Sequence, residues 1–294
     1  MDKIHIPVLL EESITALNID PNGFYIDCTL GDGGHSYKIL SRLSSQGLLL
    51  SIDRDQNAID FVKNYYEIPS NWILEKDNFS NIKDIINRKG ISRQPKGILM
   101  DLGLSSRQLE SSQNRGFSYQ EEDEALDMRM DTELNVSALD LLKALNEKEL
   151  SKLFRLYGEE RFAKPIAKAI KENISDISTV GDLTSIIYKV VPVAKNNKNP
   201  SRRVFQALRI AVNDELNSLK EGLDNAFEIL STDGRLLVIT FHSLEDRILK
   251  DFFNEKELKG EGRNLSKKPI IPDEKELKDN HRSSSAKLRI IEKF

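Results

Sequence analysis

The sequence predicts an α/β fold: an open, mostly parallel sheet with helices on its faces, interrupted by an all-helical insertion. Short apolar runs alternate with helical patterns through the first hundred residues. The alternation stops near Ser105 and resumes near Ser201. Strands separated by helices of about ten residues favour right-handed βαβ units and therefore a parallel sheet. The 294 residues are enough for a large buried core.

The first hundred residues contain four predicted strands and three predicted helices. Each strand is a short, mostly apolar run, as expected for a strand buried on both faces of a sheet. The strands are expected at residues 24–27, 48–53, 72–74 and 97–102, and the helices at residues 36–43, 56–66 and 82–88.

The middle of the chain is predicted to be helical. Residues 105–124 are rich in Ser, Gln and Glu, which predicts a loop. From about residue 136 to residue 191, apolar residues recur at helical spacing without a strand pattern. We interpret these stripes as the core positions of packed helices.

The last third of the chain returns to the α/β pattern. A long helix is expected from Ser201 to Leu230, followed by a strand at Arg235–Phe241. The remaining expectations are a helix at residues 242–253, an exposed loop around one short strand at residues 256–278, and a final strand at residues 286–294. The predicted α/β domain is therefore discontinuous, comprising residues 1–105 and 201–294, with residues 106–200 as the insertion.

Composition indicates a globular protein of the cytoplasm. Hydrophobic residues make up 39% of the chain and charged residues 31%. No apolar run approaches the roughly 20 residues that cross a bilayer, and the first residues lack the features of a signal peptide. The single cysteine, Cys28, excludes an internal disulfide, and with four histidines it leaves little material for a metal site, so none is expected.

Charge gives only local indications of a partner. The net charge of −4 does not predict a nucleic-acid-binding protein. Residues 195–209, however, carry five basic residues and no acidic one: Lys195, Lys198, Arg202, Arg203 and Arg209. Such a cluster is typical either of a solvated helix start or of a phosphate-binding surface.

A glycine-rich turn follows the first predicted strand. The strand ends at Asp27, and Gly31, Gly33 and Gly34 precede the next helix. Glycines suit a turn that needs positive φ and a ligand that approaches bare backbone. Asp53 ends the second strand, where an acidic side chain accepts the ribose hydroxyls of an adenosine.

The carboxyl ends of the next strands add to this pattern. Phe79 follows strand three and offers an aromatic face to an adenine, and Asp101 ends strand four. Open α/β sheets bind ligands outside the carboxyl ends of their strands. The glycine spacing G-x-G-G differs from the G-x-G-x-x-G of dinucleotide-binding proteins, which counts against NAD, and no kinase-type P-loop is present. Together these features favour S-adenosylmethionine as the cofactor.

Several longer motifs resemble one family closely. They are His5–Glu12, Asp27–Ser36, Asp101–Leu109, Arg115–Tyr119, Leu126–Met130, Asn199–Arg209, Thr240–Arg247 and His281–Arg289. In this order, nearly end to end, they are similar to the bacterial ribosomal RNA small subunit methyltransferase H family. The resemblance implies a class I Rossmann-like methyltransferase domain whose helical insertion helps to recognise RNA.

The resemblance also implies an activity and a set of site residues. The activity is N4-methylation of a cytidine in the decoding region of 16S rRNA, within the 30S subunit. The implied cofactor contacts are Gly33, Gly34, His35, Asp53, Phe79, Asp101 and Gln108. Of these, His35, Phe79 and Gln108 depend mainly on the resemblance. Whether the protein forms a homodimer stays open.

The target base is expected at the ends of strands four and five. Asp101 and His242 are the candidate catalytic residues, and Ser105 and Ser106 are candidate substrate contacts. The Asp101–Ser106 run lacks the Pro-Pro-Tyr typical of many amino-methyltransferases, so that motif's catalytic roles do not carry over. His242 is equally well interpreted as a structural hydrogen-bonding residue.

Two basic clusters are candidate RNA contacts. Arg202 and Arg203 form the first, and a second lies among residues 281–289. Two alternatives from other classes remain at this point. One is a small-molecule methyltransferase or NAD enzyme, and the other is a non-catalytic RNA-binding protein that retains the fold.

Overall fold

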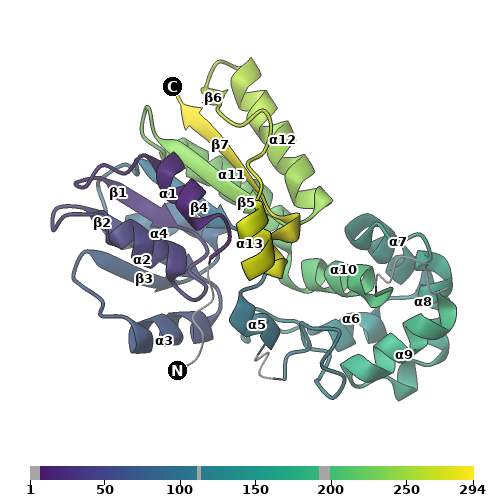
Figure 1. Ribbon diagram of the computed structural model, residues 1–294. Coiled ribbons are helices and arrows are strands. Elements are labelled where there is room, and N and C mark those ends of the chain that lie inside the picture. Colours follow the sequence, from purple (N-terminus) through teal and green to yellow (C-terminus); the bar gives the residue numbers. More distant parts are fainter. Residues whose placement is uncertain (1–6, 111–113, 192–198) are drawn as a thin grey trace. The chain divides into compact units, whose positions relative to one another are not determined.

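The computed structural model describes residues 7–110, 114–191 and 199–294, and it divides into two compact units (Figure 1). The first unit, the α/β unit, comprises Met1–Ser105 and Leu216–Phe294. The second, the helical unit, comprises Ser106–Glu215. In the described part of the chain, no helix has both the length and the apolar character needed to span a membrane.

The α/β unit is built on one seven-stranded sheet with the order β3-β2-β1-β4-β5-β7-β6. Strands β1 to β5 are parallel to one another, whereas β7 runs antiparallel to both β5 and β6. The strands are β1 (Phe24–Asp27), β2 (Leu48–Asp53), β3 (Trp72–Lys76), β4 (Gly97–Asp101), β5 (Arg235–Thr240), β6 (Gly262–Asn264) and β7 (Lys287–Lys293). The sheet confirms the predicted α/β class and brings the carboxyl ends of β1 to β5 to one edge.

Helices cover both faces of this sheet, because successive strand residues point to opposite faces and both sets are apolar. One core contains side chains from α4 (Ile82–Arg88), α11 (Glu215–Ile229) and α12 (Ser243–Leu258). The other contains side chains from α1 (Leu10–Leu17), α2 (Gly34–Leu40) and α3 (Gln56–Tyr65). The sheet is thus the middle layer of three, as in doubly wound folds.

The helical unit contains six α-helices among its described residues. They are α5 (Ser106–Glu110), α6 (Ala138–Ala144), α7 (Glu147–Gly158), α8 (Ala163–Glu172), α9 (Val180–Val190) and α10 (Ser201–Asn213). Capping boxes begin α6, α7 and α9, where a Ser, Asn or Thr side chain accepts the N–H three residues on. The leucine and isoleucine stripes are buried only in part as predicted: Leu142, Leu150, Ile166 and Ile170 are inaccessible to solvent, whereas Leu156 is 52% exposed.

The structure corrects several boundaries. The second unit boundary lies after Glu215 instead of at Ser201, because α10 packs on α7 and belongs to the helical unit. The expected helix over residues 201–230 is two helices, separated at Asp214, whose φ of 48° is left-handed. The apolar pattern continues across this break, so periodicity alone could not locate it.

Two predicted loops contain helices. Residues 105–124 include α5, and residues 256–278 include α13 (Glu274–Asp279), whose N-cap Asp273 accepts the N–H of Glu276. Both helices are a turn or two long and mostly polar, so they lack the apolar stripe by which a helix is recognised in a sequence. The N-terminal helix α1 was not predicted either.

The side chain of Asn213 holds the end of α10 against the turn at residues 128–130. Its Oδ1 accepts the Met130 N–H at 2.8 Å, and its Nδ2 donates to the Met128 carbonyl at 2.7 Å. All three groups are buried. Replacing Asn213 with Ala is therefore expected to lower the stability of the helical unit by about 1–3 kcal/mol, because buried backbone groups lose their partners. Thermal unfolding followed by circular dichroism measures this, and an unchanged melting temperature would contradict it.

Candidate functional site

The glycine loop between β1 and α2 has the backbone geometry that its sequence predicted. Gly31 and Gly33 have φ of 51° and 81°, values that favour glycine. Gly34 begins α2, and a Cβ placed on it would lie 2.2 Å from Pro7 Cγ. The first two glycines thus serve the turn, and the third serves a close packing contact.

A buried polar chain fixes the loop to the sheet. Asp27 Oδ1 accepts the Thr29 N–H at 3.1 Å, and Asp27 Oδ2 accepts the Ser36 hydroxyl at 2.6 Å. The Ser36 and Ser51 hydroxyls lie 2.8 Å apart, and Trp72 Nε1 donates to Ser51 at 2.9 Å. Sequence reasoning treated Asp27 only as the end of a strand. Its carboxylate in fact determines the course of the turn.

Asp53 closes the other side of the loop. Its Oδ2 accepts the Gly31 N–H at 2.8 Å, and its Oδ1 accepts the Asp55 N–H at 2.9 Å. A carboxylate has about four lone-pair positions. Each oxygen of Asp53 therefore keeps acceptor capacity for two adjacent hydroxyl groups of a ribose.

Asp101 lies at the end of β4, next to β1. Its backbone N–H donates to Thr29 Oγ1 at 2.6 Å, and its Oδ2 lies 3.7 Å from His35 Nδ1. Asp101 Oδ1 and His35 Nε2 are buried and have no hydrogen-bond partner among the residues that the structure describes. Buried polar atoms without partners are costly, and here two of them lie beside a glycine loop. They fit a ligand that supplies a donor to the carboxylate.

Burial alters the proton affinity of all these groups. It raises the pKa of Asp27 to about 7 and that of Asp53 to about 6. Burial, followed by the charges of Asp27, Glu245 and Glu276, raises the pKa of Asp101 well above its ordinary value. Burial lowers the pKa of His35 to about 4, so its imidazole is neutral at pH 7. A cation would relieve this crowding of carboxylates.

Two further expected cofactor contacts lie in different units. Phe79 begins a short 3-10 helix after β3, and its ring packs on Gly222 of α11, where a Cβ would lie 2.5 Å from Phe79 Cδ2. The ring is only partly buried, so an aromatic face at the end of β3 remains available. Gln108 is buried on α5 of the helical unit. Its part in cofactor binding stays a prediction.

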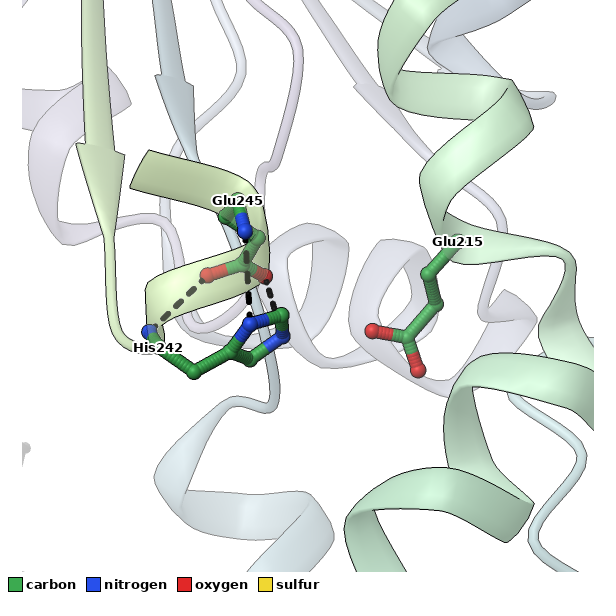
Figure 2. Close-up of side chains that lie close together, drawn as sticks. All are labelled: Glu215, His242 and Glu245. Atoms are coloured by element: carbon green, nitrogen blue, oxygen red, sulfur yellow. Dashed lines mark hydrogen bonds and ion pairs between the residues drawn. The ribbon is translucent and has the colours of Figure 1, made fainter. Parts of the chain in front are cut away.

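His242 is the N-cap of α12 (Figure 2). Its Nδ1 accepts the Glu245 N–H at 3.4 Å, and its Nε2 lies 3.1 Å from Glu245 Oε1. Glu245 Oε2 in turn accepts the Phe241 N–H at 2.9 Å. The Nδ1 bond supports the structural interpretation of His242, whereas Nε2 is buried and forms no hydrogen bond with a described residue. Glu215, also drawn in Figure 2, belongs to the helical unit. Its carboxylate accepts hydrogen bonds from Nε and Nη2 of Arg209 in the same unit.

The site includes a residue that sequence reasoning missed. Glu276 lies on α13, within the segment predicted to be an exposed loop. Its Oε1 accepts the Leu9 N–H at 2.9 Å, and its charge contributes to the raised pKa of Asp101. More than 260 positions separate the two hydrogen-bonded residues. No local pattern in the sequence could have indicated this contact.

The expected substrate contacts have different surroundings. Ser105 ends the first segment of the α/β unit, and Ser106 begins α5. Arg202 and Arg203 are exposed in the first turn of α10, where Asn199 Oδ1 accepts the Ser201 N–H. Neither arginine forms an ion pair with a described residue. Lys195 and Lys198, and the start of the His5–Glu12 motif, lie outside the described residues.

The second basic cluster is partly paired within the protein. Arg289 is buried, and its Nε donates to Asp246 Oδ1 at 2.7 Å. Lys287 Nζ donates to the other oxygen of Asp246 at 3.2 Å. Arg282 has one buried guanidinium nitrogen. The prediction that this cluster contacts RNA as a unit is wrong for Arg289, because its charge is compensated inside the protein.

Comparison with known proteins gives one consistent family. The model of the MraW methylase family matches residues 2–294. Curated proteins named ribosomal RNA small subunit methyltransferase H are similar over the whole chain. The one from Caldicellulosiruptor saccharolyticus is 45% identical, with 99% of each chain covered. Those from Fusobacterium nucleatum and Clostridium botulinum are 45% and 43% identical, with 99% or more of each chain covered.

A solved structure shows the same fold. It belongs to a protein from Clostridium thermocellum assigned as an rRNA methylase, which is 13% identical to this chain. The TM-score is 0.50, and the alignment covers 99% of this chain and 100% of the other. At this level of identity the similarity concerns the fold alone, and it agrees with a class I Rossmann-like methyltransferase architecture.

Proposed function

Because the chain belongs to the MraW methylase family, we propose that it is an S-adenosylmethionine-dependent methyltransferase acting on small-subunit ribosomal RNA. The acceptor is the N4 amine of a cytidine in the decoding region of 16S rRNA, within the 30S subunit. One observation supports binding of this cofactor most directly. The positive-φ glycine loop, Asp53 and the carboxylate of Asp101, whose Oδ1 is buried without a partner among the described residues, lie together at the carboxyl edge of one sheet.

The residues present fit this cofactor. Asp53 would hold the ribose hydroxyls, and Gly33 and Gly34 would allow the methionine part to approach the loop backbone. The unpaired Oδ1 of Asp101 would accept a hydrogen bond from the amino group of the cofactor's methionine part. When bound, S-adenosylmethionine supplies a methyl group on a positively charged sulfur, so its C–S bond breaks as the acceptor nitrogen forms the new N–C bond.

The protein's part in the reaction is to orient the acceptor amine and remove its proton. The N4 lone pair of cytosine is delocalised into the ring, which makes the amine a poor nucleophile. A carboxylate that accepts an N–H of this amine increases its nucleophilicity and can take the proton that leaves. We assign this role to Asp101, the partly buried carboxylate at the end of β4. His242, whose nitrogens face Glu245, positions the start of α12 instead.

The helical unit supports RNA as the substrate. Around the end of α7, four exposed arginines, Arg155, Arg161, Arg202 and Arg203, form no ion pair with a described residue. Leu156 and Phe162 lie beside them and are 52% and 39% exposed. A Cβ on Gly158 would lie 2.4 Å from the Arg203 carbonyl oxygen, so α7 and α10 meet here. Arginines next to exposed apolar side chains suit phosphates and unstacked bases.

Neutralising two of these arginines is expected to flatten the salt dependence of RNA binding. In Arg202→Gln/Arg203→Gln, the slope of log K against log salt should fall by about 1.4–1.8, since each phosphate contact contributes about 0.7–0.9. Filter binding to 30S subunits at several salt concentrations measures it. Arg42→Gln/Lys63→Gln, which removes two exposed charges of the α/β unit, is the matched control. Equal slopes for the two double variants would refute the assignment.

The function itself is tested with purified protein, isolated 30S subunits lacking the modification and isotopically labelled cofactor. Mass spectrometry of 16S rRNA digests should locate one added methyl group, on N4 of a single cytidine. Labelling of a different base, of free nucleosides or of a ribosomal protein would overturn the proposed acceptor. Cofactor binding without any RNA methylation would favour a small-molecule methyltransferase.

A further inference from the structure

A pocket of about 320 Å³ lies in the α/β unit where β5 ends and α12 begins. Its first wall is Thr240–Ser243. Its second wall is formed by Ile271, Pro272 and Leu277, and its third by Ser284–Lys287. Two of these walls belong to the C-terminal segment, which the proposed mechanism does not use.

The lining combines apolar faces with unused polar groups. Ile271 and Leu277 are 62% and 37% exposed, so each offers an apolar face to a ligand. The hydroxyls of Ser284 and Ser285 form no hydrogen bond with a described residue. The ammonium of Lys287 donates to Asp246 at 3.2 Å and has further N–H groups to offer.

This chemistry selects one class of ligand. Among the described residues no carboxylate lines the pocket, so Mg²⁺ or Ca²⁺ would lack its preferred ligands. The volume is at the lower end of the range for small-molecule sites, which begins at roughly 300 Å³. Apolar walls suit the faces of a flat heterocycle, the hydroxyls of Ser284 and Ser285 suit its polar edge, and the ammonium of Lys287 suits a phosphate beside it. An unstacked nucleotide has these three features.

The position of the pocket relates it to the reaction. Its first wall ends the strand next to β4, in which Asp101 pairs with Ile239 of β5. Helix α13 contributes to both places. Leu277 lines the pocket, whereas the preceding Glu276 accepts the Leu9 N–H and acts electrostatically on Asp101. A base bound here lies at the ends of the two central strands that carry the site.

We propose that this pocket holds the acceptor cytosine after it leaves the RNA stack, with Ser284 and Ser285 on its polar edge and Lys287 at its phosphate. The assignment rests on the proposed function. It adds the C-terminal segment, residues 271–287, as the wall that selects the base. Enzymes that modify a base within folded RNA must extrude it into such a pocket.

The test fills the pocket. In Leu277→Trp the larger side chain should exclude the base and lower kcat/KM on 30S subunits by about 10- to 200-fold, the cost of losing a well-fitted pocket contact. The dissociation constant for S-adenosylmethionine should stay unchanged. Leu258→Trp makes the same substitution at an 88% exposed position of α12 and should keep wild-type activity. If Leu277→Trp does not fold, Ser284→Ala/Ser285→Ala, which removes only two hydroxyls, takes its place and should also lower kcat/KM on 30S subunits.

A second measurement identifies the occupant. Once the methylated cytidine is mapped, subunits reconstituted with an abasic site at that position should bind the wild-type enzyme more weakly. The same change should not affect binding to Leu277→Trp, because the pocket is already closed to the base. Wild-type kcat/KM for Leu277→Trp, or an equal loss from base removal in both enzymes, would overturn the inference. Failure of the wild-type enzyme to methylate subunits would instead refute the proposed function.

Discussion

Replacing Asp101 with Asn is expected to lower kcat for methylation of 30S subunits by roughly 10²- to 10⁴-fold, the usual contribution of a proton acceptor. Asn keeps an oxygen that can accept a hydrogen bond but cannot take the proton from N4. A single-turnover experiment at saturating cofactor measures this loss. The loss should therefore be seen in kcat after the cofactor site is filled.

The proton affinity of Asp101 is suited to this timing. Burial and the charges of Asp27, Glu245 and Glu276 raise its pKa when no cation is nearby. A neighbouring sulfonium keeps the carboxylate ionised. Methyl transfer would move that positive charge from the sulfur to N4, and the proton that N4 then releases would carry it to Asp101, whose pKa burial holds high.

The controls separate this role from cofactor binding. Asp224→Asn removes an exposed carboxylate of α11 in the same unit and should leave kcat unchanged. His242→Ala removes a helix cap, which costs about 1 kcal/mol of stability, and should lower kcat less than Asp101→Asn does. A wild-type rate for Asp101→Asn at saturating cofactor would show that Asp101 is not the base.

Replacing Asp53 with Ala is expected to weaken binding of S-adenosylmethionine by roughly 10²- to 10⁴-fold. Two hydrogen bonds to a charged acceptor contribute about 1.5–3 kcal/mol each, and 1.4 kcal/mol corresponds to tenfold. The loop also loses the bond from the Gly31 N–H. Isothermal titration calorimetry measures the change. Asp53→Asn, which can still accept from Gly31, should lose less than Asp53→Ala. Wild-type affinity in Asp53→Asn would mean that only the loop matters.

The same carboxylates make cofactor affinity depend on pH. With pKa values raised to about 6 and about 7, Asp53 and Asp27 are protonated at pH 5 and ionised at pH 8 in the free protein. A cationic ligand binds the ionised form better, so affinity for S-adenosylmethionine should rise from pH 5 to pH 8. S-adenosylhomocysteine, which lacks the sulfonium charge, should show a smaller rise. Parallel curves for the two ligands would contradict this explanation.

The sheet could be predicted from the sequence because its signals are local. Strands such as Phe24–Asp27 and Leu48–Asp53 are apolar runs bounded by turn residues, and their predicted limits match the structure. The break at Asp214 and the short helix α13 were missed. At Asp214 the apolar pattern is unchanged, and in α13 there is almost no apolar pattern to detect.

The glycine turn of the site could be predicted because a positive φ favours glycine over other residue types. Gly31 and Gly33 have the positive φ that their glycine spacing suggested. Asp27 and Glu276 were not recognised, because their roles depend on hydrogen bonds to Ser36 and Leu9 that only the folded chain creates. The role of Arg289 was mistaken for the same reason: its partner Asp246 is 43 positions away.

The discontinuous α/β unit has a consequence for the nascent chain. By the time β4 leaves the ribosome, β1 to β4 can form half of the sheet, but the free edge of β4 must wait for β5, which follows the whole helical unit. At roughly 5–20 residues per second, translation leaves that edge open for several seconds or longer. An apolar edge strand exposed for this time is a template for aggregation. We therefore expect that truncated chains ending before Arg235 depend on chaperones, and that completed chains do not.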